Sequence, residues 1–160
     1  MRNAMLSLLF VAISANANAQ SLKERMVGSW KLVSWNVVSG GTERPPAMGS
    51  GAVGIITYSP DGYMCVNIMA PNRPKFASPD FSASSLNEKS GAFESFIGYC
   101  GRYEVNEAER FVTHQLDTSS FPNWTGSAQK RFVELSGGQI KLTTPPISNQ
   151  VHVLVWERAK

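Results

Sequence analysis

The sequence predicts an all-β fold, an eight-stranded up-and-down antiparallel barrel. Short runs rich in Val, Ile, Thr and aromatic residues recur at hairpin-sized steps, and Gly, Pro or Asn residues separate them. A single segment departs from this pattern and has helical spacing. With 160 residues and 42% hydrophobic content, the chain is long enough for one domain with a core and too short for two. Closing the strands into a barrel removes exposed edges, and eight strands enclose either side chains alone or one small ligand.

Residues 1–19 have the pattern of a secretory signal peptide. Arg2 precedes an apolar run at 5–13, and a small-residue A-N-A cleavage pattern follows at 17–19. The apolar run is shorter than the roughly 20 residues that a membrane-spanning helix needs. We therefore expect export to the periplasm or the medium, no resident membrane span, and a mature barrel domain at 20–160.

The strands before the helical segment are bounded by turn residues. The first strand runs from Trp30 to Val38 and ends at Gly40-Gly41. Two further β-rich runs lie within 51–71, joined by the sequence S-P-D-G at 59–62. Proline presets φ and glycine accepts a positive φ, so this stretch predicts a hairpin.

The hydrophobic period changes between residues 82 and 97. Leu86 and Phe93 fall at helical spacing, and Ser84 or Ser85 is suited to cap the first turn. We expect one short amphipathic α-helix here, between the third and fourth strands.

The remaining strands follow at regular spacing, and turn-forming or polar residues separate them. They are GYCGRYEV at 98–105, ERFVTHQL at 109–116, SAQKRFVEL at 127–135, QIKLTTP at 139–145 and QVHVLVWER at 150–158.

Charge and cysteine patterns exclude several classes of function. The formal net charge is +3, and the basic residues are scattered among acids without the basic stripe of a nucleic-acid binder. Cys65 and Cys100 lie outside any C-x-x-C or Cys/His cluster, so the sequence predicts no metal site and no cofactor. In an exported chain the two cysteines form either one disulfide or two buried thiols.

Several motifs carry a resemblance to a known family. The G-x-W motif at Gly28 and Trp30, with V-W-E-R at 155–158, resembles the lipocalins. That resemblance implies that Trp30 packs at the closed end of the barrel against Arg158. The longer series VGSWKLVSW, IITYSPDGYMCVNIMAPNRPKFAS, GYCGRYEV, VTHQLDTSSFPNWTG and LVWER looks like the bacterial and fungal lipocalin-like domain family. It implies a small-ligand barrel without one settled activity.

Strand alternation predicts which side chains face the interior. Outward Lys130 and Glu134 leave Gln129 and Arg131 inside. The same reasoning on two other strands, with Arg102 and Glu157 outside, places Tyr99 and His152 inside. The expected walls are apolar and aromatic with a few polar groups, as in most small-molecule sites. A buried Arg131 must meet a carbonyl, a tyrosine hydroxyl or an anionic ligand, because an unpaired buried charge is very costly. The predicted ligand-binding residues, including two rim aromatics, are Asn36, Tyr58, Met64, Ile68, Tyr103, His114, Phe121, Trp124, Gln129 and Arg131.

His114 leaves two interpretations open. No Ser, Cys or carboxylate lies at a spacing typical of a catalytic triad, and Asp117 has the opposite parity. A hydrogen-bonded core histidine is therefore the simpler interpretation. General acid–base work by His114 and Tyr103 is the alternative, and it predicts an isomerase or cyclase. We favour a barrel that binds a small hydrophobic or amphipathic molecule; a filled, purely structural barrel is the third hypothesis.

Overall fold

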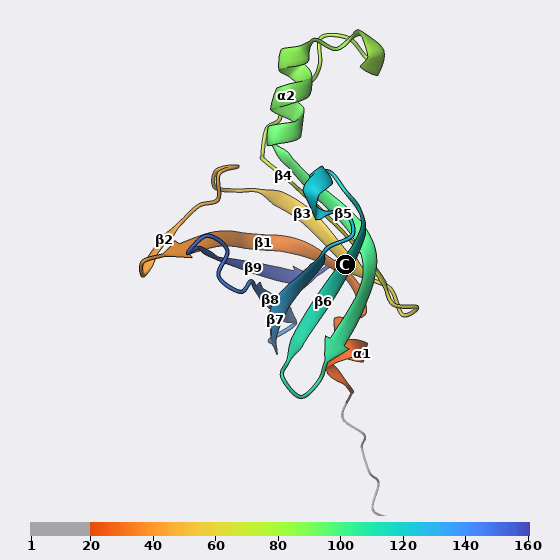
Figure 1. Ribbon diagram of the computed structural model, residues 1–160, viewed down its shortest axis with the longest axis vertical. Coiled ribbons are helices and arrows are strands. Elements are labelled where there is room, and N and C mark those ends of the chain that lie inside the picture. Colours follow the sequence, from red (N-terminus) through yellow and green to blue (C-terminus); the bar gives the residue numbers. More distant parts are fainter. Residues whose placement is uncertain (1–19) are drawn as a thin grey trace, which may run out of the picture.

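The computed structural model describes residues 20–160, so the predicted signal peptide at 1–19 lies outside the described residues. This part of the chain forms an all-β, antiparallel barrel in which β1 pairs with both β3 and β9 and so closes the sheet (Figure 1). Eight strands make the barrel, and a short ninth strand, β2, extends β1 at one end. The strands are β1 Gly28–Ser39, β2 Thr42–Arg44, β3 Val53–Tyr58, β4 Tyr63–Met69, β5 Phe96–Asn106, β6 Phe111–Ser119, β7 Ala128–Ser136, β8 Gln139–Thr143 and β9 Val151–Arg158.

The predicted helix forms, but its predicted place between the third and fourth strands was wrong. It is α2, Leu86–Glu94, and it lies between β4 and β5. The order shifts because residues 42–44 fold back on β1 across the turn at Gly40 and Gly41, whose φ angles are 56° and 77°. Three polar and charged residues carry too little alternation to be recognised as a strand. Ser85 caps α2 in a capping box with Glu88.

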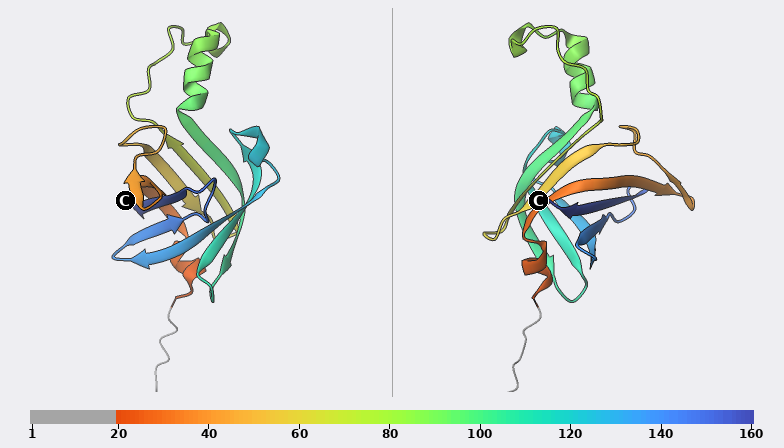
Figure 2. Two further views of the ribbon diagram at one scale, coloured as in Figure 1. Left: turned by 60° about the vertical axis from the view of Figure 1, so that its left-hand side comes forward. Right: turned by 180° about the vertical axis from the view of Figure 1, so that it is seen from behind.

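Three further short helices lie within residues 20–160. They are α1 Leu22–Met26 and the 3-10 helices η1 Phe81–Ala83 and η2 Pro122–Trp124. Figures 1 and 2 show α2 projecting from one end of the barrel and α1 lying at the other. Helix α1 was not expected, although its S-x-x-E capping box is visible in the sequence. Within residues 20–160, no helix is long and apolar enough to cross a membrane.

The end of the barrel beside α1 is filled by side chains. Trp30 is buried and donates its indole N–H to the Met26 carbonyl oxygen at 2.8 Å. The Arg158 guanidinium lies 4.1 Å from the centre of a Trp30 ring and donates to the carbonyl oxygens of Val27 and Arg25. Because α1 also buries its apolar side chains in the core, this end is packed, and any interior space lies toward the other end.

A β-bulge in β1 changes which of its side chains face inward. The pairing with β9 slips between Leu32 and Ser34, and the extra residue Val33 is 49% exposed. One added residue reverses the alternation beyond it. Trp35 therefore turns into the barrel, and the predicted inward orientation of Asn36 was wrong: its amide donates to the Glu43 carboxylate on β2.

Cys65 and Cys100 lie directly opposite each other on β4 and β5, with Cα atoms 4.1 Å apart, and their sulfur atoms are bonded. The Cys65 side chain is on the exposed face of β4, where buried and exposed residues alternate along the strand. The disulfide therefore ties two neighbouring strands on the outside of the barrel and leaves the interior untouched.

Candidate ligand-binding cavity

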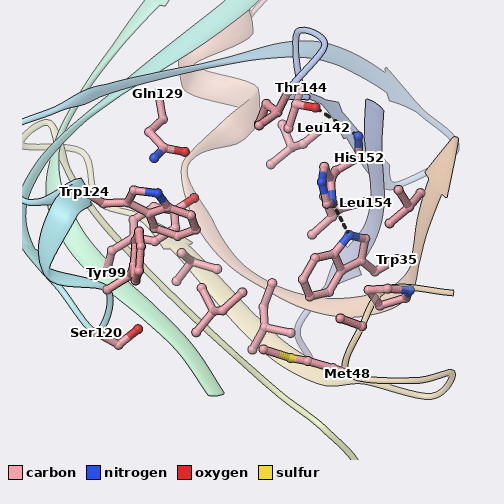
Figure 3. A pocket seen from close by; sticks show the side chains of 18 of the residues that line it. Trp35, Met48, Tyr99, Ser120, Trp124, Gln129, Leu142, Thr144, His152 and Leu154 are labelled. Carbon is pink, nitrogen blue, oxygen red and sulfur yellow. Dashed lines mark hydrogen bonds between the residues drawn. The ribbon is translucent and has the colours of Figure 1, made fainter. Parts of the chain in front are cut away.

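A cavity of about 640 Å³ occupies the half of the barrel remote from α1 (Figure 3). Its walls come from β1 to β9, and the rim comes from the β2–β3 loop, α2, the η2 segment and the β8–β9 loop. The strands place these side chains inside because alternate residues of each strand face the barrel axis. The apolar wall residues include Val37, Ile56, Val66, Ile68, Ile97, Leu142 and Leu154.

Aromatic side chains stand on two opposite sides of the cavity. Figure 3 shows Trp124 beside Tyr99 on one side and Trp35 beside His152 on the other. The Trp124 ring is edge-on to Tyr99, with centroids 6.0 Å apart, and edge-on to Phe121 at 5.5 Å. Edge-on packing is favourable because the positive edge of one ring meets the negative face of the other. Together they leave a space with aromatic surfaces on both sides.

His114 lies at the inner wall and is held between two tyrosines. It is completely buried, with Nε2 2.9 Å from the Tyr58 hydroxyl and Nδ1 3.4 Å from the Tyr99 hydroxyl. Burial, and secondarily the charge of Arg131, lower the pKa of His114 to about 3. The imidazole is therefore neutral at physiological pH, and it connects β3, β5 and β6 through hydrogen bonds.

Two arginines line the cavity, the exposed Arg44 of β2 and the half-buried Arg131. The Arg131 guanidinium donates to the Lys130 carbonyl oxygen and to Gln129 Oε1, both at 2.8 Å. Burial, then the charge of Arg131 and then that of Arg44, lower the pKa of His152. The charge of Arg131 also opposes the rise that burial causes in the pKa of Tyr99. Among the described residues, the one carboxylate that lines the cavity is that of Glu94, exposed at the end of α2.

Six of the predicted ligand-binding residues line this cavity, and four do not. Tyr58, Met64 and Tyr103 lie inside the barrel but are buried in the core outside the cavity lining, and Asn36 is on the outside. The six that line it are Ile68, His114, Phe121, Trp124, Gln129 and Arg131.

Tyr103 and His114 are not hydrogen-bonded to each other, and Tyr103 does not line the cavity where a substrate would meet His114. They are directly opposite in the β5–β6 ladder, but the Tyr103 hydroxyl donates to the Ser59 carbonyl oxygen at 2.8 Å. The Tyr103 ring packs edge-on against Tyr58, with centroids 5.0 Å apart. The two tyrosines that contact His114 are instead Tyr58 and Tyr99.

The lining residues absent from the predicted set include Trp35, Tyr99 and His152. Strict alternation from Trp30 puts Trp35 on the outer face, and no residue type in the sequence indicates the bulge that reverses this. Tyr99 and His152 have the inward parity, but nothing in the sequence distinguishes them from ordinary core residues. The Trp35 indole N–H donates to His152 Nδ1 at 3.1 Å, which brings β1 and β9 together at the cavity wall (Figure 3).

Comparison with known proteins identifies relatives of this chain. Residues 27–159 match the family model for a lipocalin-like domain. The 4'-hydroxy-3'-methoxypropiophenone carrier protein ppsC of Aspergillus oryzae is 31% identical over 98 residues, which cover 58% of this chain and 83% of that protein.

Solved structures with similar architecture have low sequence identity. A redesigned β-barrel is 11% identical with a TM-score of 0.45, covering 88% of this chain and 100% of its own. An uncharacterised protein from Bacteroides eggerthii is 14% identical with a TM-score of 0.42, covering 81% and 98%. The fluorescent protein UnaG is 14% identical with a TM-score of 0.39, covering 86% and 100%.

Proposed function

Because the chain belongs to the lipocalin-like domain family, we propose that it is an exported carrier that binds a small amphipathic or aromatic molecule inside its barrel. The observation that carries this proposal is the cavity itself. Its volume of about 640 Å³ falls within the roughly 300 to 1,000 Å³ of small-molecule sites, and apolar walls with a few polar groups are their usual composition.

The relative in Aspergillus oryzae supports an aromatic ligand. Its name identifies it as a carrier of 4'-hydroxy-3'-methoxypropiophenone, a compound with one aromatic ring, a phenolic hydroxyl and a ketone. In this chain, Trp35 and Trp124 stand on opposite sides of the cavity (Figure 3). A ring placed between them would gain the offset or edge-on contacts that aromatic groups prefer.

The surroundings of His114 favour a carrier over an isomerase or cyclase. A general base works best with a pKa near the working pH, and the pKa of His114 is lowered to about 3. Both ring nitrogens are also occupied by tyrosine hydroxyls. Tyr103 is the other candidate acid or base, and its hydroxyl donates to the Ser59 carbonyl oxygen.

The disulfide supports the exported location that the N-terminal pattern predicts. Disulfides persist in oxidising compartments and are rare in the cytosol. The Cys65–Cys100 bond would form after export, where it would tie β4 to β5.

Tryptophan fluorescence offers a direct test of binding. Three of the four tryptophans, Trp35, Trp124 and Trp156, line the cavity, so a ligand there should change their emission. Titrating residues 20–160 with 4'-hydroxy-3'-methoxypropiophenone should produce a saturable, one-site change. Mass spectrometry of the recovered compound then separates the two activities, because a carrier returns it unchanged and an isomerase or cyclase does not.

A matched pair of variants locates the site. Leu142→Trp fills the cavity, whereas Lys141→Trp adds the same side chain on the opposite face of β8. Calorimetric titration should show loss of binding for Leu142→Trp alone, with circular dichroism confirming that both variants are folded. Absence of saturable binding in the natural chain, or equal binding by both variants, would refute an interior ligand site.

A further inference from the structure

Arg131 carries more hydrogen-bond donors than the protein satisfies. A guanidinium has five N–H groups, and two of them donate to Lys130 and Gln129 within residues 20–160, which leaves three. In the same part of the chain the one ion pair joins Lys141 to Glu134, so no carboxylate neutralises Arg131. The side chain is half-buried in the cavity wall, where an uncompensated charge is costly.

The Tyr58–His114–Tyr99 chain of hydrogen bonds also ends in a donor. Among the described residues, the buried Tyr58 hydroxyl has His114 as its single hydrogen-bond partner, so its proton must go to Nε2. A neutral imidazole then carries its own proton on Nδ1 and donates it to the Tyr99 oxygen. This leaves the proton of Tyr99, which lines the cavity, free to be donated to a ligand.

His152 presents a donor for the same reason. The indole N–H of Trp35 can only donate, so His152 Nδ1 must accept it and the neutral ring carries its proton on Nε2. Burial and the charges of Arg131 and Arg44 lower the pKa of His152, which keeps the ring neutral. Nδ1 of His152 is therefore occupied by Trp35, and Nε2 is left as a hydrogen-bond donor.

A further unsatisfied donor lines the cavity. Trp156 is buried, and within residues 20–160 its indole N–H is the buried side-chain polar group that has no hydrogen-bond partner. The Gln129 carbonyl oxygen is taken by Arg131, so its NH₂ group is what remains for a ligand. Gln129 points into the cavity near Trp124 (Figure 3). The groups of Tyr99, Gln129, Arg131, His152 and Trp156 that remain for a ligand are thus N–H and O–H donors.

We propose that this cavity selects a ligand with an anionic oxygen, a phenolate or a carboxylate, which binds the Arg131 guanidinium and the Tyr99 hydroxyl. The proposal rests on the proposed function of the same cavity. An anionic oxygen supplies both the missing acceptor and the missing negative charge, and a bond between ions is stronger than one between neutral groups. A neutral ketone or ether would satisfy a donor but leave the charge uncompensated. The aromatic body of the ligand then lies between Trp35 and Trp124.

The ionisation of the ligand provides the test. The phenol and phenolate forms of 4'-hydroxypropiophenone differ in ultraviolet absorption, so its pKa can be measured free and bound to residues 20–160. A positive charge in contact with the phenolate should lower the ligand's pKa by about 1 to 3 units on binding. Arg131→Gln should abolish most of that shift and weaken binding roughly 10- to 100-fold, whereas Arg131→Lys should retain part of the shift.

Two controls separate this proposal from the proposed function. Lys130→Gln removes a neighbouring charge that lies over the Phe111 ring outside the cavity, and it should leave the shift unchanged. The methyl ether 4'-methoxypropiophenone cannot ionise, and its weaker binding should be insensitive to Arg131→Gln. Equal affinity for phenol and ether, with no pKa shift in the natural chain, would overturn the anionic head group while leaving a carrier. Binding of neither compound would overturn both proposals.

Discussion

The hydroxyl oxygen of Tyr58 lies 2.9 Å from Nε2 of His114, and both side chains are completely buried. This contact joins β3 to β6 across the interior, between strands that are not neighbours in the sheet. It holds the imidazole in one orientation and one tautomer, so His114 acts as a structural part of the cavity wall.

Tyr58→Phe should destabilise the protein by about 1 to 3 kcal/mol. The substitution keeps the ring but leaves Nε2 of His114 buried without a partner, and an unsatisfied buried polar group has a cost of this size. Urea denaturation measures the change. Tyr63→Phe removes a hydroxyl from an exposed ring and should alter stability by less than about 0.5 kcal/mol. Equal effects of the two substitutions would refute the role of this hydrogen bond.

Stability should fall as the pH decreases below 6.5. The pKa of His114 is 6.5 when unfolded and about 3 when folded, so below pH 6.5 the unfolded chain binds a proton that the folded protein excludes. The contribution of neutral His114 to the free energy of unfolding is complete above pH 6.5 and is lost progressively toward pH 3. Between pH 6.5 and 5 the loss should be about 2 kcal/mol. Denaturation curves at both pH values measure it, and His114→Gln should remove this part of the pH dependence.

Breaking the disulfide should cost about 2 to 4 kcal/mol. The bond closes a loop between residues 35 apart in sequence, and the chain-entropy model gives a stabilisation of this order. Intact mass before and after reduction and alkylation first establishes the bond. Stability should then fall on reduction of the natural chain and remain constant on treatment of the Cys65→Ser, Cys100→Ser double variant. Persistence of the natural chain's full stability after reduction would contradict this account.

Gly28→Ala should destabilise the end of the barrel beside α1 by roughly 1 to 3 kcal/mol. Gly28 has a φ of +125°, and an added Cβ would lie 2.5 Å from Nη1 of Arg158, which stacks on Trp30. Gly91→Ala is the matched control, because Gly91 is inside α2 with open space around it. There alanine should be neutral or stabilise by up to about 1 kcal/mol. Thermal unfolding of the two variants measures the contrast.

The bulge in β1 makes a prediction about ligand affinity. Trp35→Ala removes an aromatic wall and should weaken binding of an aromatic ligand roughly tenfold or more, whereas Asn36→Ala should leave affinity unchanged. Without the bulge the two outcomes would be exchanged, because strict alternation places Asn36 inside. Calorimetric titration of both variants with 4'-hydroxypropiophenone decides between the two registers.

Much of the barrel could be predicted because its signals are local. Turn chemistry at 59–62 and the spacing of β-rich runs indicate hairpins. The inward parity of Gln129 and Arg131 follows from the charged residues Lys130 and Glu134 on the other face of the same strand. The position of α2 in the strand order could not be obtained in this way. The strand at 42–44 is too short and too polar to leave a periodic signal, and it exists because β1 offers it a pairing edge.

The sequence by itself determined the fold class, the family resemblance and the inward parity of most strands, because hydrophobic alternation and turn residues act between near neighbours. Tertiary structure alone decided which polar groups meet. Tyr58, Tyr99 and His114 come from three different strands, and their contacts depend on the closure and stagger of the barrel. It also decided that Trp35 lines the cavity, since a bulge arises from how two strands pair and not from the residue types on one of them.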